Sequence, residues 1–497
     1  MTGGSLEELR TTQQISWLDD VDANGVIINP QHELFGKSIA GTELHLPSAS
    51  GSTVGSDRIV NLAVRGFAPK RIVLEQTDPI TMWGAILGKI GIEIRGTVQK
   101  TVDRGKLEAL GIDPEIADFL ARAGELLGTD EFIPVDHVQI AGVSYKTITE
   151  TGLELRRHFG SKYKFRSKHV TINPAGMDLE DWKGLGIPEE FARKQAEVIE
   201  IYRKMGAIPT ITCTPYLIGS MPEPFTDSFL SESSVVGYAN SVLAVRTNRE
   251  SGLSTLLYAI AGYGPRYGLH LQENRNPRVE IRVNCELKGV VDYSLLGYKL
   301  GELVRGRIPY ITGIRSRPTL EEFKVLSAAG AASGSIDLYH IEEITPEAAG
   351  HLITLDRIEE CIEITRDSLN EVKKKLNTGK VEDLDLVTFG CPHASLNEVK
   401  EIAALLEGKK VRNGVKLWVC TSRAVKEMSK RLGYVATVEA AGGNVVADTC
   451  MVVAPIEEMG YTTTATNSGK AAKYLPRFCH QHVVFDSAEE IIGRIVD

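Results

Sequence analysis

The last third of this chain alternates strand-like and helix-like segments, and no other feature of the sequence limits the fold so strongly. Strand-like runs lie at 384–389, 416–419, 444–447 and 482–485, and helix-like runs lie at 355–376, 395–406, 422–432 and 488–495. A helix between two strands returns the chain so that the second strand runs parallel to the first. The pattern therefore predicts an α/β fold in which helices cover a parallel sheet, with ligands bound beyond the carboxyl ends of its strands.

Length and composition describe a large globular chain. Its 497 residues exceed what one hydrophobic core supports, so about two to four domains are expected. The net charge of −9 argues against a nucleic-acid-binding surface, which would be basic. There is no apolar run of about 20 residues, and the first residues are polar and acidic. We therefore expect no membrane span, no signal peptide and a cytoplasmic location.

The predicted secondary structure changes along the chain and divides it into four parts. The expected parts are a flexible lead-in (1–15), a β-rich module (16–102), the first part of a larger body (103–345) and the α/β part described above (346–497). In the larger body, helices are predicted from Pro114 to Leu127 and from Ile187 to Gly206, because proline favours a helix start and glycine a helix end. A strand is predicted at 208–212.

Seven cysteines are present, and Cys213, Cys391 and Cys450 each end a strand-like run in turn-like surroundings. Thiolates that converge at strand ends can hold an iron–sulfur cluster and leave one iron open as a Lewis acid. Lone cysteines are also common as small buried hydrophobes, and no Cys-x-x-Cys pair occurs here. Cys420 ends another strand-like run and competes for the role of ligand. The spacing alone leaves a metal site and structural thiols as alternatives.

Four polar segments could bind an anion or move a proton. Residues 47–56 combine glycines with hydroxyls, so their backbone N–H groups could form an anion-binding nest around a reactive hydroxyl. Residues 231–249 place polar side chains on an otherwise apolar, helix-like stretch. Segments 270–275 and 466–470 offer basic residues for a carboxylate or phosphate. Each alone could equally be a solvated turn, a capped surface helix or an exposed charge run.

Together these segments resemble the aconitase X family over nearly the whole chain. Residues 25–84 are similar to the small subunit of that family, and residues from about 103 onward to its large subunit. The motifs that carry the resemblance are Asn29-Pro30-Gln31-His32, Gly51-Ser52-Thr53-Val54-Gly55-Ser56, Ala68-Pro69, Gly142-Val143-Ser144, Asn173-Pro174-Ala175-Gly176, Thr212-Cys213-Thr214-Pro215-Tyr216, 232–248, Gly390-Cys391-Pro392-His393, Asp448-Thr449-Cys450 and Thr466-Asn467-Ser468-Gly469-Lys470. The resemblance implies an aconitase-like, multi-domain α/β/α catalytic body with an N-terminal β-rich swivelling domain. Both are fused in one chain, so no separate subunit is required.

The resemblance also implies roles for particular residues. It makes Cys213, Cys391 and Cys450 the ligands of a [4Fe-4S] cluster, with a [2Fe-2S] cluster or mononuclear iron as alternatives. Ser52 corresponds to the catalytic serine of the family and would act as the base. The substrate-binding candidates, chosen from these segments and their charges, are Gly142, Val143, Ser144, Asn173, Pro174, Glu232, Arg275 and Lys470. Because Ser52 lies in the module and the cysteines in the body, we expect the site in a closing cleft between them.

The family's two known activities are dehydrations of cis-3-hydroxy-L-proline and of mevalonate 5-phosphate, the latter giving trans-anhydromevalonate 5-phosphate in the mevalonate pathway. Phosphate requires N–H nests or Arg and Lys, whereas a ring ammonium requires Asp or Glu. Cationic candidates outnumber acidic ones, so the sequence favours a hydro-lyase of (R)-mevalonate 5-phosphate over the hydroxyproline enzyme. A non-catalytic iron–sulfur sensor is an alternative of another class. The expected partner is a small-molecule substrate, with neither nucleic acid nor membrane.

Overall fold

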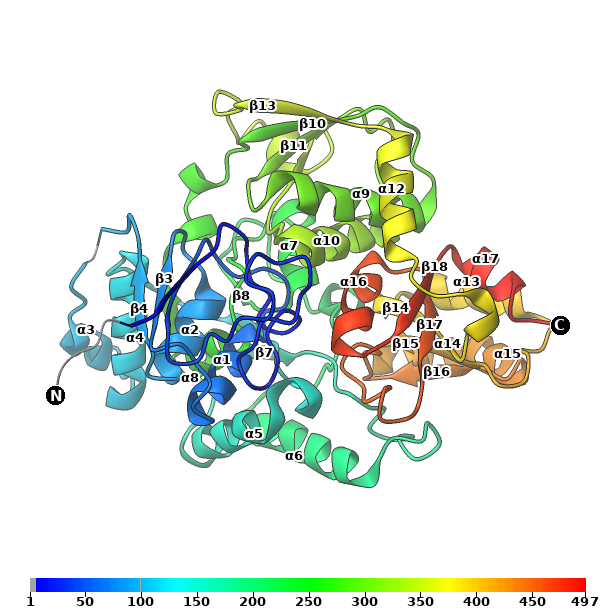
Figure 1. The fold of residues 1–497 in the computed structure, drawn as a ribbon, viewed down its shortest axis with the longest axis horizontal. Helices are drawn as coiled ribbons and strands as arrows, with labels where there is room; N and C mark the ends of the chain where they lie inside the picture. Colours follow the sequence, from blue (N-terminus) through cyan, green and yellow to red (C-terminus); the bar gives the residue numbers. More distant parts are fainter. Residues whose placement is uncertain (1–5, 99) are drawn as a thin grey trace.

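The structure is a computed structural model that describes residues 6–98 and 100–497. Parallel strands form four of the sheets in the described part, and β5 and β9 form a small antiparallel pair. In Figure 1 the N-terminal module lies on the left, the β10–β13 sheet at the top and the C-terminal sheet on the right. No helix in the described residues is long and apolar enough to cross a membrane.

The N-terminal module is a four-stranded parallel sheet, ordered β1-β2-β3-β4, packed with two helices. Its elements are β1 (Glu8–Arg10), β2 (Glu43–Leu46), α1 (Gly55–Val64), β3 (Arg71–Leu74), α2 (Pro79–Leu87) and β4 (Gly91–Ile94). Strand β1 falls within the expected flexible lead-in, and Glu8 to Arg10 pair with β2, so that expectation was wrong for these residues. Residues 1–5 of the lead-in lie outside the described residues.

The first part of the body packs its helices against α1 and α2 of the module, and its own three-stranded sheet has the order β7-β6-β8. Its elements are α3 (Arg104–Ala109), α4 (Pro114–Leu127), β5 (Phe132–Pro134), β6 (His137–Ile140), α5 (Tyr145–Lys162), β7 (His169–Ile172), α6 (Glu189–Met205), β8 (Phe229–Leu230), α7 (Ser233–Val242), α8 (Gly252–Ala261) and β9 (Tyr263–Pro265). Helices α4 and α6 confirm the two predicted helices. The predicted strand at 208–212 is absent, because Pro209 lacks an N–H donor and Ile211 adopts a positive φ.

A second four-stranded parallel sheet has the order β12-β11-β10-β13. Its elements are β10 (Val279–Val283), α9 (Gly289–Val304), β11 (Pro309–Thr312), α10 (Leu320–Gly334), β12 (His340–Ile341), α11 (Pro346–Ala349), β13 (Glu360–Ile364) and α12 (Arg366–Leu376). The helix predicted over 355–376 is therefore wrong in its first half. Thr365 caps α12 together with Ser368, and the β-branched residues before it pair with β10 as an edge strand.

The C-terminal sheet has the order β16-β15-β14-β17-β18, and every pairing is parallel, as the alternation of the sequence predicts. Its elements are β14 (Leu386–Ala394), α13 (Leu396–Leu406), β15 (Lys416–Thr421), α14 (Arg423–Arg431), α15 (Tyr434–Ala440), β16 (Asn444–Ala447), β17 (Thr463–Thr466), α16 (Gly469–Phe478), β18 (His482–Phe485) and α17 (Ala488–Gly493). Serines 395, 422 and 468 each cap the helix that follows them.

The module and the body share one hydrophobic core. Buried residues from Leu9 to Tyr267 form a continuous cluster that includes both β2 and α8. The fully buried side chain of Asp57 on α1 pairs with the equally buried Arg156 on α5, and Trp83 donates a hydrogen bond to Tyr258. The shared core and the buried Asp57–Arg156 pair hold the module against the body, and the closing motion expected from the sequence stays a prediction.

Candidate active site

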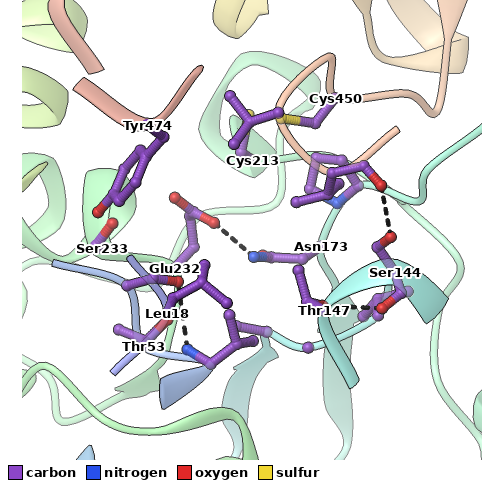
Figure 2. A pocket seen from close by; sticks show the side chains of 18 of the residues that line it. Leu18, Thr53, Ser144, Thr147, Asn173, Cys213, Glu232, Ser233, Cys450 and Tyr474 are labelled. Carbon is purple, nitrogen blue, oxygen red and sulfur yellow. Dashed lines mark hydrogen bonds between the residues drawn. The ribbon is translucent and has the colours of Figure 1, made fainter. Parts of the chain in front are cut away.

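One cavity brings residues from both ends of the chain into contact. Its empty space, which includes the part open to solvent, is about 690 Å³. Figure 2 shows Cys213 and Cys450 at one end of the cavity and Thr53 at the other, with Glu232 and Asn173 between them. The candidates from the sequence that line this cavity are Ser52, Gly142, Val143, Ser144, Asn173, Pro174, Cys213, Glu232, Cys391, Cys450 and Lys470.

Three loops carry the cysteines to the cavity. Cys213 follows Thr212, whose N–H is hydrogen-bonded to β7, and Cys391 lies in an irregular stretch of β14. Cys450 follows β16, and its N–H donates to the carbonyl of Ala175 at 3.1 Å. The loop of Cys450 is thereby joined to the loop that carries Asn173 and Pro174.

His393 connects the three cysteine loops. Its backbone N–H donates to Cys213 Sγ at 3.2 Å. Its Nε2 lies 2.9 Å from the carbonyl of Thr449 and so must donate, which leaves Nδ1 to accept from Thr212 Oγ1 at 2.9 Å. Burial lowers the pKa of His393 to about 4, so the ring stays neutral in this one tautomer. A single side chain thus fixes the relative positions of loops that are far apart in the sequence.

The sulfur atoms are spread more widely than a single ion would hold them. Among the described residues, only Glu8, Glu43 and His45 bring three such ligand atoms within 4.8 Å of one another, so at least one pair of the three cavity sulfurs lies farther apart. Two sulfurs bound to one ion are at most about 4.6 Å apart, twice a metal–sulfur bond of about 2.3 Å. An iron–sulfur cluster distributes its thiolates over several irons, so the three-sulfur donor set fits such a group.

The trio Glu8, Glu43 and His45 is a surface feature of the module. It does not line the cavity, and its carboxylates already pair with Arg10 and Arg71.

The side chains of Cys391 and Cys450 affect each other's ionisation. The thiol of Cys450 lowers the pKa of Cys391, and Cys391 together with burial raises the pKa of Cys450 well above its usual value. The pKa of Cys213 is raised to about 12, mainly by burial and to a smaller extent by the nearby carboxylate of Glu232. All three become thiolates together only when a bound cation compensates their charge.

Cys420 does not line the cavity. It is fully buried on β15, and it belongs to the apolar core beneath the cysteine loops. At Gly390 the backbone has φ +89° and passes so close to β15 that a Cβ would lie 2.0 Å from the carbonyl oxygen of Cys420. Glycine is therefore required there. This crossing brings Cys391 over the end of β15 and leaves Cys420 underneath.

Ser52 reaches the cavity from the loop before α1. The N–H of Val54 lies 3.5 Å from Ser52 Oγ, and the helix begins at Gly55. Arg249 of the body holds the loop by donating to the carbonyls of Gly51 at 2.9 Å and Ala49 at 3.2 Å. The hydroxyl of Ser52 is thus placed by contacts with the body as well as with its own module.

Four helices begin at this cavity. Residues 52–54 precede α1, 142–144 precede α5, Glu232 caps α7, and Lys470 lies in the first turn of α16. Each N-terminus carries about half a positive charge, although the first N–H groups of α5 already donate to Gln195 and Ser144. Since each of these helices has at least 10 residues, the cavity wall attracts anions.

Glu232 is the only carboxylate among the residues lining the cavity, and its charge is already compensated. Lys470 Nζ donates to its Oε1, Asn173 Nδ2 donates to its Oε2, and Ser234 Oγ donates at 2.9 Å. Burial alone would raise the pKa of Glu232, but Lys470 and these hydrogen bonds hold it below the usual value. Among the described residues that line the cavity, none therefore offers a free carboxylate to receive a cation.

Family models match the chain almost end to end. They are the aconitase X swivel domain over residues 4–109 and the first, second and third aconitase X domains over 92–273, 277–374 and 384–497. The phosphomevalonate dehydratase large subunit of Methanocaldococcus jannaschii is 45% identical over 381 residues, which cover 76% of this chain and 94% of that protein. The chain belongs to the aconitase X family.

Other aconitase X proteins extend this likeness. The crystal structure of Thermococcus kodakaraensis aconitase X (holo-form) is 39% identical, with a TM-score of 0.72 over 80% of this chain and 100% of that one. The phosphomevalonate dehydratase small subunit of Methanothrix thermoacetophila is 44% identical over 93 residues, 18% of this chain and 68% of that protein. The cis-3-hydroxy-L-proline dehydratase of Pseudomonas aeruginosa is 29% identical over 519 residues, 92% and 88% of the two chains. The relatives that carry a functional name are dehydratases, and this aconitase X protein is a hydro-lyase.

Arg275 lies outside the cavity, contrary to its prediction as a substrate-binding residue. It is fully buried and donates to both carboxylate oxygens of Glu347, at 2.7 and 2.9 Å, and to Asn240 Oδ1 at 3.1 Å. Its charge is therefore already compensated, and its contact with Asn240 anchors α7. The sequence showed the basic residue but not the distant carboxylate that binds it.

The residues of the candidate site that were not predicted from the sequence include His393, Leu18 and Tyr474. His393 was noted only as part of a cysteine motif, and Leu18 and Tyr474 not at all, although both line the cavity. Tyr474 follows Lys470 by four residues on α16, and this spacing places both on one face of a helix. That signal was present in the sequence. No local pattern pointed to Leu18, which comes from a loop of the module.

Proposed function

We propose that this chain dehydrates (R)-mevalonate 5-phosphate to trans-anhydromevalonate 5-phosphate, a step of the mevalonate pathway. The observation that carries the proposal is the charge of the cavity. Four helix N-termini surround it, and Glu232, the only carboxylate among its described lining residues, is paired with Lys470. A carboxylate and a phosphate find donors in such a cavity, whereas the ring ammonium of hydroxyproline finds no free anionic partner.

The relatives support the same choice. The phosphomevalonate dehydratase subunits are 45% and 44% identical to the parts of this chain that they match, whereas the hydroxyproline dehydratase is 29% identical. Together the two subunit types correspond to the body and the module of this single chain. The hydroxyproline activity is thus the alternative with less support.

Ser52 is proposed as the base that removes the proton from the carbon next to the substrate carboxylate. A serine hydroxyl is a weak base unless its alkoxide is stabilised. The N–H of Val54 and the N-terminus of α1 lie next to Ser52 Oγ and favour its charged form. Loss of this proton and of the neighbouring hydroxyl forms the double bond of the product and releases water.

Cys213, Cys391 and Cys450 are proposed to hold a [4Fe-4S] cluster. Such a cluster, when bound with one iron free of protein thiolate, supplies a Lewis acid for the departing hydroxyl. The chain's own contribution is to fix the three thiols through His393 and to orient the substrate between them and Ser52. Lys470 and Glu232 provide the polar wall along which the substrate lies.

The test is a side-by-side assay of protein reconstituted anaerobically with iron and sulfide. Product formation from mevalonate 5-phosphate and from cis-3-hydroxy-L-proline is followed by NMR. We expect turnover of the phosphate compound and little of the other. Turnover of hydroxyproline alone would overturn the substrate assignment.

Ser52→Ala tests the base. General-base loss costs about 100- to 10,000-fold in rate, so we expect kcat to fall at least about 100-fold. Ser50→Ala is the matched control, because Ser50 lies in the same loop and does not line the cavity. Equal activities of the two variants would remove Ser52 from the reaction.

A further inference from the structure

Two buried polar atoms that line the cavity have no hydrogen-bond partner among the described residues. They are Tyr474 Oη and Asn173 Oδ1. Leaving such a group unpaired in the folded protein costs about 1–3 kcal/mol, and native structures contain few of them. Because Tyr474 lines the cavity, its unpaired hydroxyl is available to a ligand that binds there.

The position of Tyr474 is defined by its neighbours. It follows Lys470 on α16, and its side chain is 3% exposed. A Cβ built on Gly51, the residue before Ser52, would lie 3.4 Å from Tyr474 Oη. Figure 2 shows the ring extending along the cavity wall toward Ser233. The hydroxyl therefore lies between the loop of the proposed base and the paired wall of Glu232 and Lys470.

The hydroxyl of Tyr474 is a donor at neutral pH. Burial, together with the nearby Asp19 carboxyl, raises the pKa of Tyr474 above that of an ordinary tyrosine. It therefore keeps its proton when an anion enters the cavity. A neutral phenol aimed at an anion shifts little charge in the resting state and gains strength as negative charge grows on its acceptor.

We propose that Tyr474 is a catalytic residue that donates a hydrogen bond from Oη to the substrate carboxylate. This inference rests on the proposed dehydration. When Ser52 takes the proton from the carbon beside the carboxylate, the electron pair of that C–H bond moves toward the carboxylate oxygens. The Tyr474 hydrogen bond then shortens and stabilises this charge. The pair next forms the carbon–carbon double bond as the hydroxyl leaves.

Tyr474→Phe tests this role, because it removes only the hydroxyl and keeps the ring. Losing one preorganised donor of this kind costs about 100- to 1,000-fold in kcat, and we expect a loss of about 100-fold with KM little changed. The Tm should stay the same or rise, because the variant no longer buries an unpaired hydroxyl.

Tyr339→Phe is the matched control. Tyr339 is also buried, but its hydroxyl lies 2.9 Å from Ser327 Oγ and it does not line the cavity. This variant should lower the Tm and keep kcat. A Tyr474→Phe variant with wild-type kcat, or with a Tm lowered as much as that of Tyr339→Phe, would overturn the assignment. If the wild type does not turn over mevalonate 5-phosphate, the proposed substrate is wrong. The kcat values of wild type and Tyr474→Phe would then be compared with cis-3-hydroxy-L-proline, which also carries a carboxylate, and that comparison would decide the role of Tyr474.

Discussion

Replacing Arg156 should destabilise the junction between module and body far more than replacing its neighbour Arg157. The side chain of Arg156 is 0% exposed, and it pairs with Asp57, which is 1% exposed. Burial raises the pKa of Asp57 even with the arginine opposite, so without Arg156 the carboxyl must take up a proton or remain an unpaired buried charge. Removing one partner of such a pair costs about 3–5 kcal/mol. Arg156→Met should lower the free energy of unfolding by that amount.

The adjacent arginine provides the control. Arg157 pairs with Glu197 and Glu150, but its side chain is 42% exposed, and surface pairs contribute about 0–1 kcal/mol. Urea unfolding followed by tryptophan fluorescence would report the module through Trp17 and Trp83, both buried there. The double variant Asp57→Asn/Arg156→Met should lose less than the sum of the two single variants. Equal losses for Arg156→Met and Arg157→Met would refute the claim that burial makes this pair decisive.

Two further predictions concern the thiols and pH. After anaerobic reconstitution, the variants Cys213→Ser, Cys391→Ser and Cys450→Ser should each lack the brown colour and most of the iron. Cys420→Ser should keep both. If Cys420→Ser is colourless and Cys213→Ser is coloured, the cluster has a different set of ligands. Burial raises the pKa of Asp19 from 3.8 in the unfolded chain to about 7 in the folded protein. The protonated carboxyl therefore contributes its full stabilisation below pH 3.8, and this contribution is lost as the pH rises through about 7. Asp19→Asn should therefore gain Tm relative to the wild type as pH rises from about 4 to about 7, and a difference that stays constant over this range would contradict this.

The sequence predicts regular segments well and long-range contacts poorly. The C-terminal alternation gives the parallel sheet because each βαβ unit is local, and its helix caps are local too. The segment 355–364 was read as helix because an edge strand with exposed glutamates has no local signal that separates it from a helix start. Arg275 shows the same limit, since its partner Glu347 is 72 residues away.

The candidate site follows the same division. Cys213, Cys391, Cys450 and Ser52 were named from motifs that are visible along the chain, and all four line the cavity, while their roles stay predictions. The link that His393 makes between three loops depends on residues 180 and 56 positions away, so only the folded chain reveals it. Tyr474 could be predicted only in part. Its helical spacing from Lys470 is visible in the sequence, but its lack of a hydrogen-bond partner appears only in the folded cavity.

The shared core of module and body bears on how activity responds to dilution. Relatives named as small and large subunits match the two parts of this chain separately. For two separate polypeptides, the cavity exists only while they are associated, so specific activity falls once their concentration drops below the dissociation constant. A covalent connection keeps each part in the presence of the other at an effective concentration on the order of millimolar, whatever the bulk concentration. Specific activity of this enzyme should therefore stay constant down to concentrations at which a two-chain relative comes apart.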